Sequence, residues 1–111
     1  MDRLFETYDL WVTPAGVQQA PAIGSFDPGH GDEDLQTYAA RALRDYAAFT
    51  PLLNITGHPA ASVPVCHGSN GLPVGTQIVA PLGDEATIFR VSAQLEAVAR
   101  WSQRRPAHSV F

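Results

Sequence analysis

The chain has 111 residues, enough for one domain or part of one, and 45% of them are apolar while 16% are charged. This balance is typical of a packed interior and argues against a disordered chain. The formal net charge of -4, without a long basic run, excludes a protein that binds nucleic acid mainly by electrostatic attraction.

Cysteine content and the amino-terminal residues indicate the cellular setting. Cys66 is the only cysteine, so the chain cannot form an intrachain disulfide or build a cysteine-based metal site. Residues 1–10 lack an apolar stretch of signal-peptide length, and no segment approaches the ~20 apolar residues of a membrane span. We therefore expect a cytoplasmic protein with no membrane and no nucleic-acid partner.

The first half of the chain predicts a strand, a long loop and a helix. Residues 8–13, YDLWVT, are rich in β-branched and aromatic types and predict a buried strand. Residues 14–34 are rich in proline and glycine and predict a long loop, of the kind that often forms a lid or a binding surface. Apolar residues then recur at helical spacing and predict a helix from Leu35 to Ala48, with acidic residues 32–34 at its positive end.

The second half begins with an irregular segment and a hairpin. The dipeptide Thr50-Pro51 is expected to end the helix, and residues 50–59 to be irregular. Residues 61–66 and 72–80 then predict two strands, and Asn70-Gly71 between them suits a turn that needs positive φ. Because Pro64 has no amide donor, its strand is expected at a sheet edge or to be irregular there.

A final helix is predicted from the cap residue Asp84 to about Trp101. The apolar residues expected on one face of this helix are Ile88, Val91, Leu95, Val98 and Ala99. The fold class is therefore α/β, with the order strand, long loop, helix, β-hairpin, helix. Three strands cannot close a sheet, so we expect at least one sheet edge and one helix face to need partner structure.

Nucleophilic and metal-binding patterns are weak in this sequence. Ser69 lies in Gly-Ser-Asn-Gly, which lacks the strand-turn-helix setting of a nucleophile elbow and favours a hairpin turn. Cys66 precedes His67 directly, which suggests a thiol nucleophile with a histidine base, but adjacent strand residues point to opposite faces and would not pair. We therefore expect Cys66 to be a small buried hydrophobe. The four histidines lack the short spacing that supplies two ligands from one element, and we expect neither a metal site nor a cofactor. These histidines are His30, His58, His67 and His108.

Three segments in a fixed order resemble one known family. They are YDLWVTPA at residues 8–15, FTPLLNITGHPAASVPV at 49–65 and GLPVGTQIVAPLGDEATIFRVSAQLE at 71–96. Together they resemble the C-terminal portion of the amidase signature family, in which a strand ending in Thr-Pro precedes a variable loop. An Asn-x-x-Gly-x-Pro segment, a Gly-Leu-Pro-x-Gly-x-Gln strand and a final helix then follow. The likeness spans about Phe5 to Pro106.

The resemblance implies a fold and an activity. The fold would be part of the mixed-sheet amidase signature domain, with residues 1–111 as its C-terminal part. The activity would be hydrolysis of a carboxylic amide through an acyl-serine intermediate. In that family the two catalytic serines and their lysine lie upstream, and this sequence contains no lysine. The resemblance therefore implies that the chain has no catalytic residue of its own, is inactive alone and needs the upstream catalytic segment.

The resemblance also suggests residues for the substrate pocket. We expect Thr13, Asn54 and Ile55, which border the long loops, to help line the pocket for the acyl group of a small-molecule amide. Gly75 would let another chain segment or a ligand approach its strand closely. Gln77 would need hydrogen-bond partners if it is buried in the sheet.

Other functions stay open at this level. A related possibility is the amidotransferase subunit that releases ammonia from glutamine, which shares the C-terminal pattern. A different class is a noncatalytic association module that completes a split amidase, and a homo-oligomer is also possible. A third hypothesis, an independent hydrolase that uses Ser69 with a histidine, has the weakest support.

Overall fold

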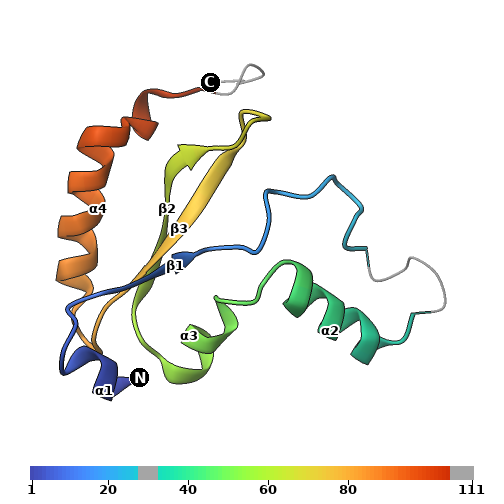
Figure 1. The fold of residues 1–111 in the computed structure, drawn as a ribbon, viewed down its shortest axis with the longest axis horizontal. Coiled ribbons are helices and arrows are strands. Elements are labelled where there is room, and N and C mark those ends of the chain that lie inside the picture. The colour runs from blue at the N-terminus through green and yellow to red at the C-terminus, as the bar shows by residue number, and fades with distance from the viewer. Residues whose placement is uncertain (28–32, 106–111) are drawn as a thin grey trace.

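The computed structural model describes residues 1–27 and 33–105, which form a three-stranded antiparallel sheet with helices on two sides (Figure 1). The helices are α1 (Asp2–Phe5), α2 (Leu35–Asp45), α3 (Pro51–Thr56), α4 (Glu85–Ala99) and the short 3-10 helix η1 (Trp101–Gln103). The strands are β1 (Trp11–Pro14), β2 (Ala60–His67) and β3 (Pro73–Val79). This arrangement confirms the predicted α/β class.

The central strand of the sheet is β3, and the strand order is β1-β3-β2. β2 and β3 form the predicted hairpin, whose turn contains Gly71 at φ 79°, a conformation that glycine adopts without strain. The pairing of β2 with β3 is irregular between Val63 and Cys66, on either side of Pro64. β2 is an edge strand of this sheet, so the prediction for Pro64 is confirmed.

The first strand is shorter and later than the predicted residues 8–13. The amides of Thr7 and Tyr8 donate to the carbonyl of Leu4, which extends the turn of α1. Pairing then begins at Trp11, opposite Val79. The helical turn therefore takes the amide of Tyr8, which the sequence pattern assigned to the strand.

The irregular segment predicted at residues 50–59 is wrong, because α3 occupies residues 51–56. Pro51 is at the first turn of this helix, where the missing amide costs no hydrogen bond, and it therefore begins a helix after ending the preceding one. The preceding helix, α2, ends at Asp45 and not at Ala48, since the chain leaves the helical conformation at Tyr46.

The final helix begins as predicted and ends two residues early. The Oδ1 atom of Asp84 accepts a hydrogen bond from the amide of Thr87, which confirms the cap. Ile88 is buried, but Val98 is 84% exposed, so the predicted apolar face is wrong at that position. The helix gives way at Arg100, in left-handed conformation, to η1.

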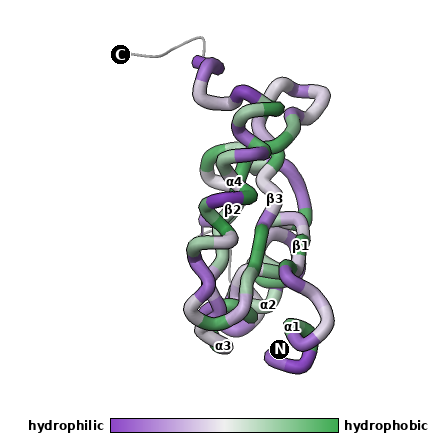
Figure 2. The backbone as a smooth tube through the Cα atoms, turned by 90° about the vertical axis from the view of Figure 1, so that its left-hand side faces the viewer, coloured by the Kyte–Doolittle hydropathy of each residue, from purple (hydrophilic) through white to green (hydrophobic). Residues whose placement is uncertain are grey.

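The helices divide between the two sides of the sheet. The two views agree that α4 lies on one side and α2 on the other (Figures 1 and 2). The side chains of Ile78 and its pairing partner Ala61 share one face, and Gln77 and Thr13 share the opposite face, because successive strand residues alternate. The buried hydrophobic residues are Leu53, Val63, Ile78, Val79, Ala80 and Ile88.

The packing is incomplete for a chain of this size. The chain exposes 8038 Å², whereas a compact protein of 11.9 kDa exposes about 5,900 Å². Its radius of gyration is 16.5 Å, compared with about 13 Å for a compact domain of this length. Large apolar side chains such as Ile55 and Phe89 are 83% and 74% exposed. No helix among the described residues is long and apolar enough to cross a membrane.

Candidate functional site

A buried polar pair lies at the centre of the sheet. Thr13 in β1 and Gln77 in β3 are direct pairing partners, and the Nε2 atom of Gln77 donates a 3.0 Å hydrogen bond to the Oγ1 atom of Thr13. The Thr13 hydroxyl in turn donates to the carbonyl of Pro14 at 3.0 Å. Only 4% of Gln77 and 8% of Thr13 is exposed, so this bond satisfies groups that would be costly to bury unpaired. The partner expected for Gln77 is thereby identified.

Gly75 allows a close approach two residues before Gln77 on the same face. A Cβ atom at Gly75 would lie 2.8 Å from the Oγ atom of Ser62 and 2.9 Å from the Cβ atom of Ala15. The amide of Ala15 donates to the Gly75 carbonyl at 2.9 Å. The segments that approach Gly75 are thus β2 and the start of the long loop. All three residues line a cleft between the sheet and this loop, and we call Ala15, Ser62 and Gly75 the cleft floor.

The loop after β1 is tied to the end of α2. The amide of Val17 donates to the carbonyl of Tyr46 at 3.1 Å, and the Nε2 atom of Gln18 donates to the carbonyl of Asp45 at 2.9 Å. The side chain of Gln19 lies where a Cβ atom of Gly68 would be, so the loop also reaches the hairpin turn. These contacts hold residues 15–20 across one face of the sheet.

A cleft of about 380 Å³ lies between this loop, the cleft floor and the connection from α2 to α3. Its volume lies in the range of small-molecule sites. The lining residues are Ala15, Gly16, Gln18, Gln19, Ala20, Tyr46, Ala47, Thr50, Ser62, Pro73, Val74 and Gly75. None of them carries a formal charge, and they offer hydroxyl and amide groups among small side chains. This arrangement suits a neutral organic ligand.

The predicted site residues lie outside this lining. Thr13 is buried directly beside the cleft floor, where its hydroxyl is already paired with Gln77. Asn54 and Ile55 are exposed on α3. The structure therefore does not bring the three together at this cleft, and their contact with substrate stays a prediction.

Sequence reasoning missed Ser62 and Tyr46. Ser62 alternates along β2 with the buried Val63, and this alternation assigns the two residues to opposite faces. No local pattern tells which face meets the long loop. Tyr46 falls within the helix predicted from Leu35 to Ala48, whereas it lies just beyond α2 and lines the cleft.

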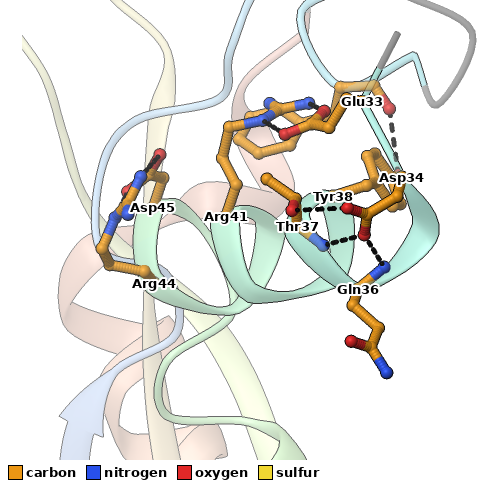
Figure 3. Close-up of polar contacts among 9 residues, drawn as sticks. Glu33, Asp34, Gln36, Thr37, Tyr38, Arg41, Arg44 and Asp45 are labelled. Atoms are coloured by element: carbon orange, nitrogen blue, oxygen red, sulfur yellow. Dashed lines mark hydrogen bonds and ion pairs between the residues drawn. The ribbon is translucent and has the colours of Figure 1, made fainter.

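A polar cluster at the far end of the loop attaches it to the start of α2 (Figure 3). Arg41 donates from Nε and Nη2 to the two carboxylate oxygens of Glu33 at 3.0 and 2.8 Å, and its guanidinium lies 5.5 Å from the ring centroids of Phe26 and Tyr38. The hydrogen bonds from Arg41 hold the pKa of the Glu33 carboxyl below its ordinary value. Both ends of the loop are thus attached to α2.

Asp34 caps α2 beside this cluster (Figure 3). Its Oδ1 atom accepts hydrogen bonds from the amides of Gln36 and Thr37 at 2.8 and 2.9 Å. The backbone donor of Thr37, followed by its hydroxyl, lowers the pKa of the Asp34 carboxyl. The predicted role of an acidic residue at this helix start is confirmed for Asp34, while Asp32 and His30 lie outside the described residues.

Ser69 and Cys66, the two residues considered as nucleophiles, lie in the β2–β3 hairpin. Ser69 lies in the hairpin turn closed by hydrogen bonds between Gly68 and Leu72 and between Gly71 and Gly68, as expected for a turn residue. Cys66 is exposed, so the prediction that it is buried is wrong; it belongs to an edge strand beyond the irregular pairing. The Nδ1 atom of His67 lies 2.6 Å from Nη1 of Arg104.

His58 is buried, and its ring contacts α1. Its ring stacks on Phe5 with centroids 5.4 Å apart, and its Nε2 atom lies 3.2 Å from Oδ1 of Asp2. That distance suits an ion pair, but the angles do not meet those of a hydrogen bond. His58 therefore packs α1 against the turn before β2, and His108 lies outside the described residues.

Comparison with known proteins identifies relatives across most of the chain. The chain is 38% identical over 109 residues to a 6-aminohexanoate-cyclic-dimer hydrolase of Paenarthrobacter ureafaciens, covering 96% of this chain and 22% of the relative. It is 37% identical over 106 residues to a fatty acid amide hydrolase of Medicago truncatula, covering 94% and 16%. The chain therefore spans about a fifth of the length of such relatives.

A solved structure confirms the likeness in three dimensions. The structure of a 6-aminohexanoate cyclic dimer hydrolase in complex with its substrate matches 96% of this chain and 23% of the solved chain, with a TM-score of 0.82 and 36% identity. The family model described as Amidase matches residues 1–89. This chain belongs to the amidase family.

Proposed function

We propose that this chain is the C-terminal part of an amidase signature enzyme that hydrolyses carboxylic amides through an acyl-serine intermediate. The proposal rests on the family match over residues 1–89 and on relatives of which the chain spans about a fifth. The two serines and the lysine of the catalytic relay would lie on the upstream segment. The absence of lysine from this sequence supports that division, since the relay needs one.

The exposed surface supports the need for further structure. A chain that exposes 8038 Å², with both edges of a three-stranded sheet free among the described residues, has not buried the apolar area that a stable domain needs. The same observation supports the second candidate, a noncatalytic module or subunit that completes a split amidase or a glutamine-dependent amidotransferase. A cooperative unfolding transition of the isolated chain would favour the module, and aggregation would favour a part of one larger domain.

In the proposed enzyme this chain supplies part of the pocket for the acyl group. An activated serine attacks the amide carbonyl, donors stabilise the oxyanion, ammonia or amine leaves, and water then releases the acid. The cleft beside Ser62 and Gly75 would hold the acyl group during these steps. Thr13 would fix the end of β1 beneath it, and Asn54 and Ile55 would extend the pocket along α3. We place the enzyme in the cytoplasm, because the chain has a single cysteine.

The direct test is hydrolysis of a panel of aliphatic and aromatic amides, including the 6-aminohexanoate cyclic dimer, followed by product release. The panel is applied to the 111-residue chain and to the protein encoded by the complete source reading frame. We expect turnover only in the longer protein. Turnover by the 111-residue chain would contradict the placement of the catalytic residues upstream, and an inactive longer protein with an intact fold would contradict the amidase function.

A further inference from the structure

The cleft beside β3 differs from the surface around it in charge. None of its twelve lining residues is acidic, basic or histidine. A second cavity about the outer loop is lined by Glu33 and Arg41, which pair with each other. Ionised side chains therefore line the second cavity, whereas none lines the cleft beside β3.

Ser62 offers a hydrogen-bonding side chain on the cleft floor. Ser62 is exposed, and its Oγ atom lies beside Gly75, where any larger residue would place its Cβ atom. Within residues 1–27 and 33–105 its side chain makes no hydrogen bond, whereas Thr13, on the same sheet face, is committed to Gln77. The Ser62 hydroxyl is therefore free to donate to or accept from a ligand.

A neutral lining sets a condition on the ligand. An ionised group that leaves water for such a site loses part of its hydration and finds no counter-charge among these twelve residues, which disfavours its binding. A neutral polar group loses much less and can recover a hydrogen bond from a hydroxyl or an amide. The part of the pocket wall that this chain supplies therefore disfavours an ionised group.

We propose that this cleft is the acyl subsite for amides whose acyl group carries no ionised group, with Ser62 as a specificity-determining residue. The inference rests on the proposed amidase function and narrows it. Glutamine carries an ammonium and a carboxylate on its acyl group, and neither would find a counter-charge among the twelve lining residues. The subsite therefore favours a hydrolase of uncharged amides over the glutamine-dependent amidotransferase.

The test compares three amides of similar length in the protein encoded by the complete reading frame. Hexanamide is neutral, 6-aminohexanamide is cationic and the monoamide of adipic acid is anionic. We expect kcat/KM for hexanamide to exceed that for either charged amide by at least about tenfold. Equal values for the three amides would overturn the inference.

Two variants assign the preference to Ser62. Ser62→Asp adds a carboxylate to the cleft floor, so the ratio of kcat/KM for 6-aminohexanamide to that for hexanamide should rise by about tenfold or more, mainly through KM. Ser62→Ala should raise KM for hexanamide by a few-fold with little change in kcat, because it removes one neutral hydrogen bond. Ser69→Ala, in the hairpin turn outside the cleft, is the matched control. It should change neither the ratio of the two kcat/KM values nor KM for hexanamide. An unchanged ratio in Ser62→Asp would contradict the role of Ser62.

Binding separates this inference from the proposed function. If the protein hydrolyses no amide, the amidase proposal fails, and calorimetric Kd values for the same three amides still test the cleft. Preference for hexanamide that is lost in Ser62→Asp would support the subsite. Equal affinity for the three amides, or no measurable binding, would overturn it.

Discussion

The two sides of the sheet are held by different forces. On the α4 side, Ile88 is buried beside Ala61 of β2, and Val63 and Ile78 are buried in the sheet, Ile78 with 1% exposed. On the other side, α2 has no buried residue and is attached by a salt bridge, a helix cap and backbone hydrogen bonds to the long loop. The hydrophobic side is a scaffold, and the polar side is a loop and helix fastened to it.

This difference determines where a ligand site can form. Burial of apolar area stabilises by about 25 cal/mol per Å², whereas exposed ion pairs contribute about 0–1 kcal/mol. The α2 side can therefore be displaced at lower cost than the α4 side. The cleft lies where the two meet, with a floor on the rigid sheet and a rim on the loop. Binding residues often occur on loops that a rigid scaffold positions.

The largest effect is expected from the core of the scaffold. Ile78→Ala should lower the free energy of unfolding by about 3 kcal/mol, because it leaves a cavity at a fully buried position. Leu35→Ala, at a position in α2 that is 77% exposed, should change it by less than about 0.5 kcal/mol. Urea unfolding of the protein encoded by the complete reading frame, followed by tryptophan fluorescence, measures both. Equal losses would contradict the contrast between the two sides.

The next effect concerns the buried polar pair. Thr13→Val keeps the shape but leaves Nε2 of Gln77 buried without its acceptor, which should cost about 1–3 kcal/mol. Thr13→Ser retains the hydroxyl and should lose clearly less in the same urea titration. If Val and Ser were equally destabilising, the methyl group rather than the hydrogen bond would be responsible.

The caps of α2 and α4 should differ in their effect on the stability of the sheet. Asp84→Ala should cost about 1 kcal/mol in cooperative unfolding, because α4 packs on the sheet. Asp34→Ala should lower the helical signal in circular dichroism at 222 nm while leaving the urea midpoint of the sheet in place. A shift of that midpoint by Asp34→Ala as large as the shift by Asp84→Ala would show that α2 and the sheet unfold as one unit.

The smallest effect is a pH dependence confined to α2. The folded pKa values of Glu33 and Asp34 lie below their ordinary values of 4.5 and 3.8. Their contribution to stability is therefore complete above about pH 4.5 and is lost as pH falls through the lowered folded values. We expect the amide chemical shift of Thr37 to change in that range and that of Ile78 to stay constant. A parallel change in both would contradict local titration.

Local signals account for the parts of the fold that the sequence predicts. Asn70-Gly71 between two apolar runs predicts the hairpin, and Asp84 before a periodic run predicts α4, because each depends on neighbours along the chain. Pro51 is ambiguous by the same reasoning, since it can end one helix and begin the next. That ambiguity explains why α3 was missed.

The candidate site depends on contacts that sequence patterns do not contain. Ser62 and Tyr46 meet at one cleft only because the loop after β1 crosses the sheet and bonds to the end of α2. Gly75 and Gln77 were recognised as constrained positions, but their partners Ala15 and Thr13 are far away in the chain. The roles of Asn54 and Ile55 stay a prediction, because both residues are exposed and lie outside the cleft lining.

The proposed pocket for the acyl group lies between the sheet and the loop after β1. The most direct measurement is photocrosslinking of the complete enzyme with an uncharged aliphatic amide that carries a diazirine on its acyl chain, followed by peptide mapping. We expect labels in residues 15–20 and 46–50 and at Ser62, which excess hexanamide suppresses. Labels confined to α4 or to the hairpin turn, with the same competition, would contradict this placement.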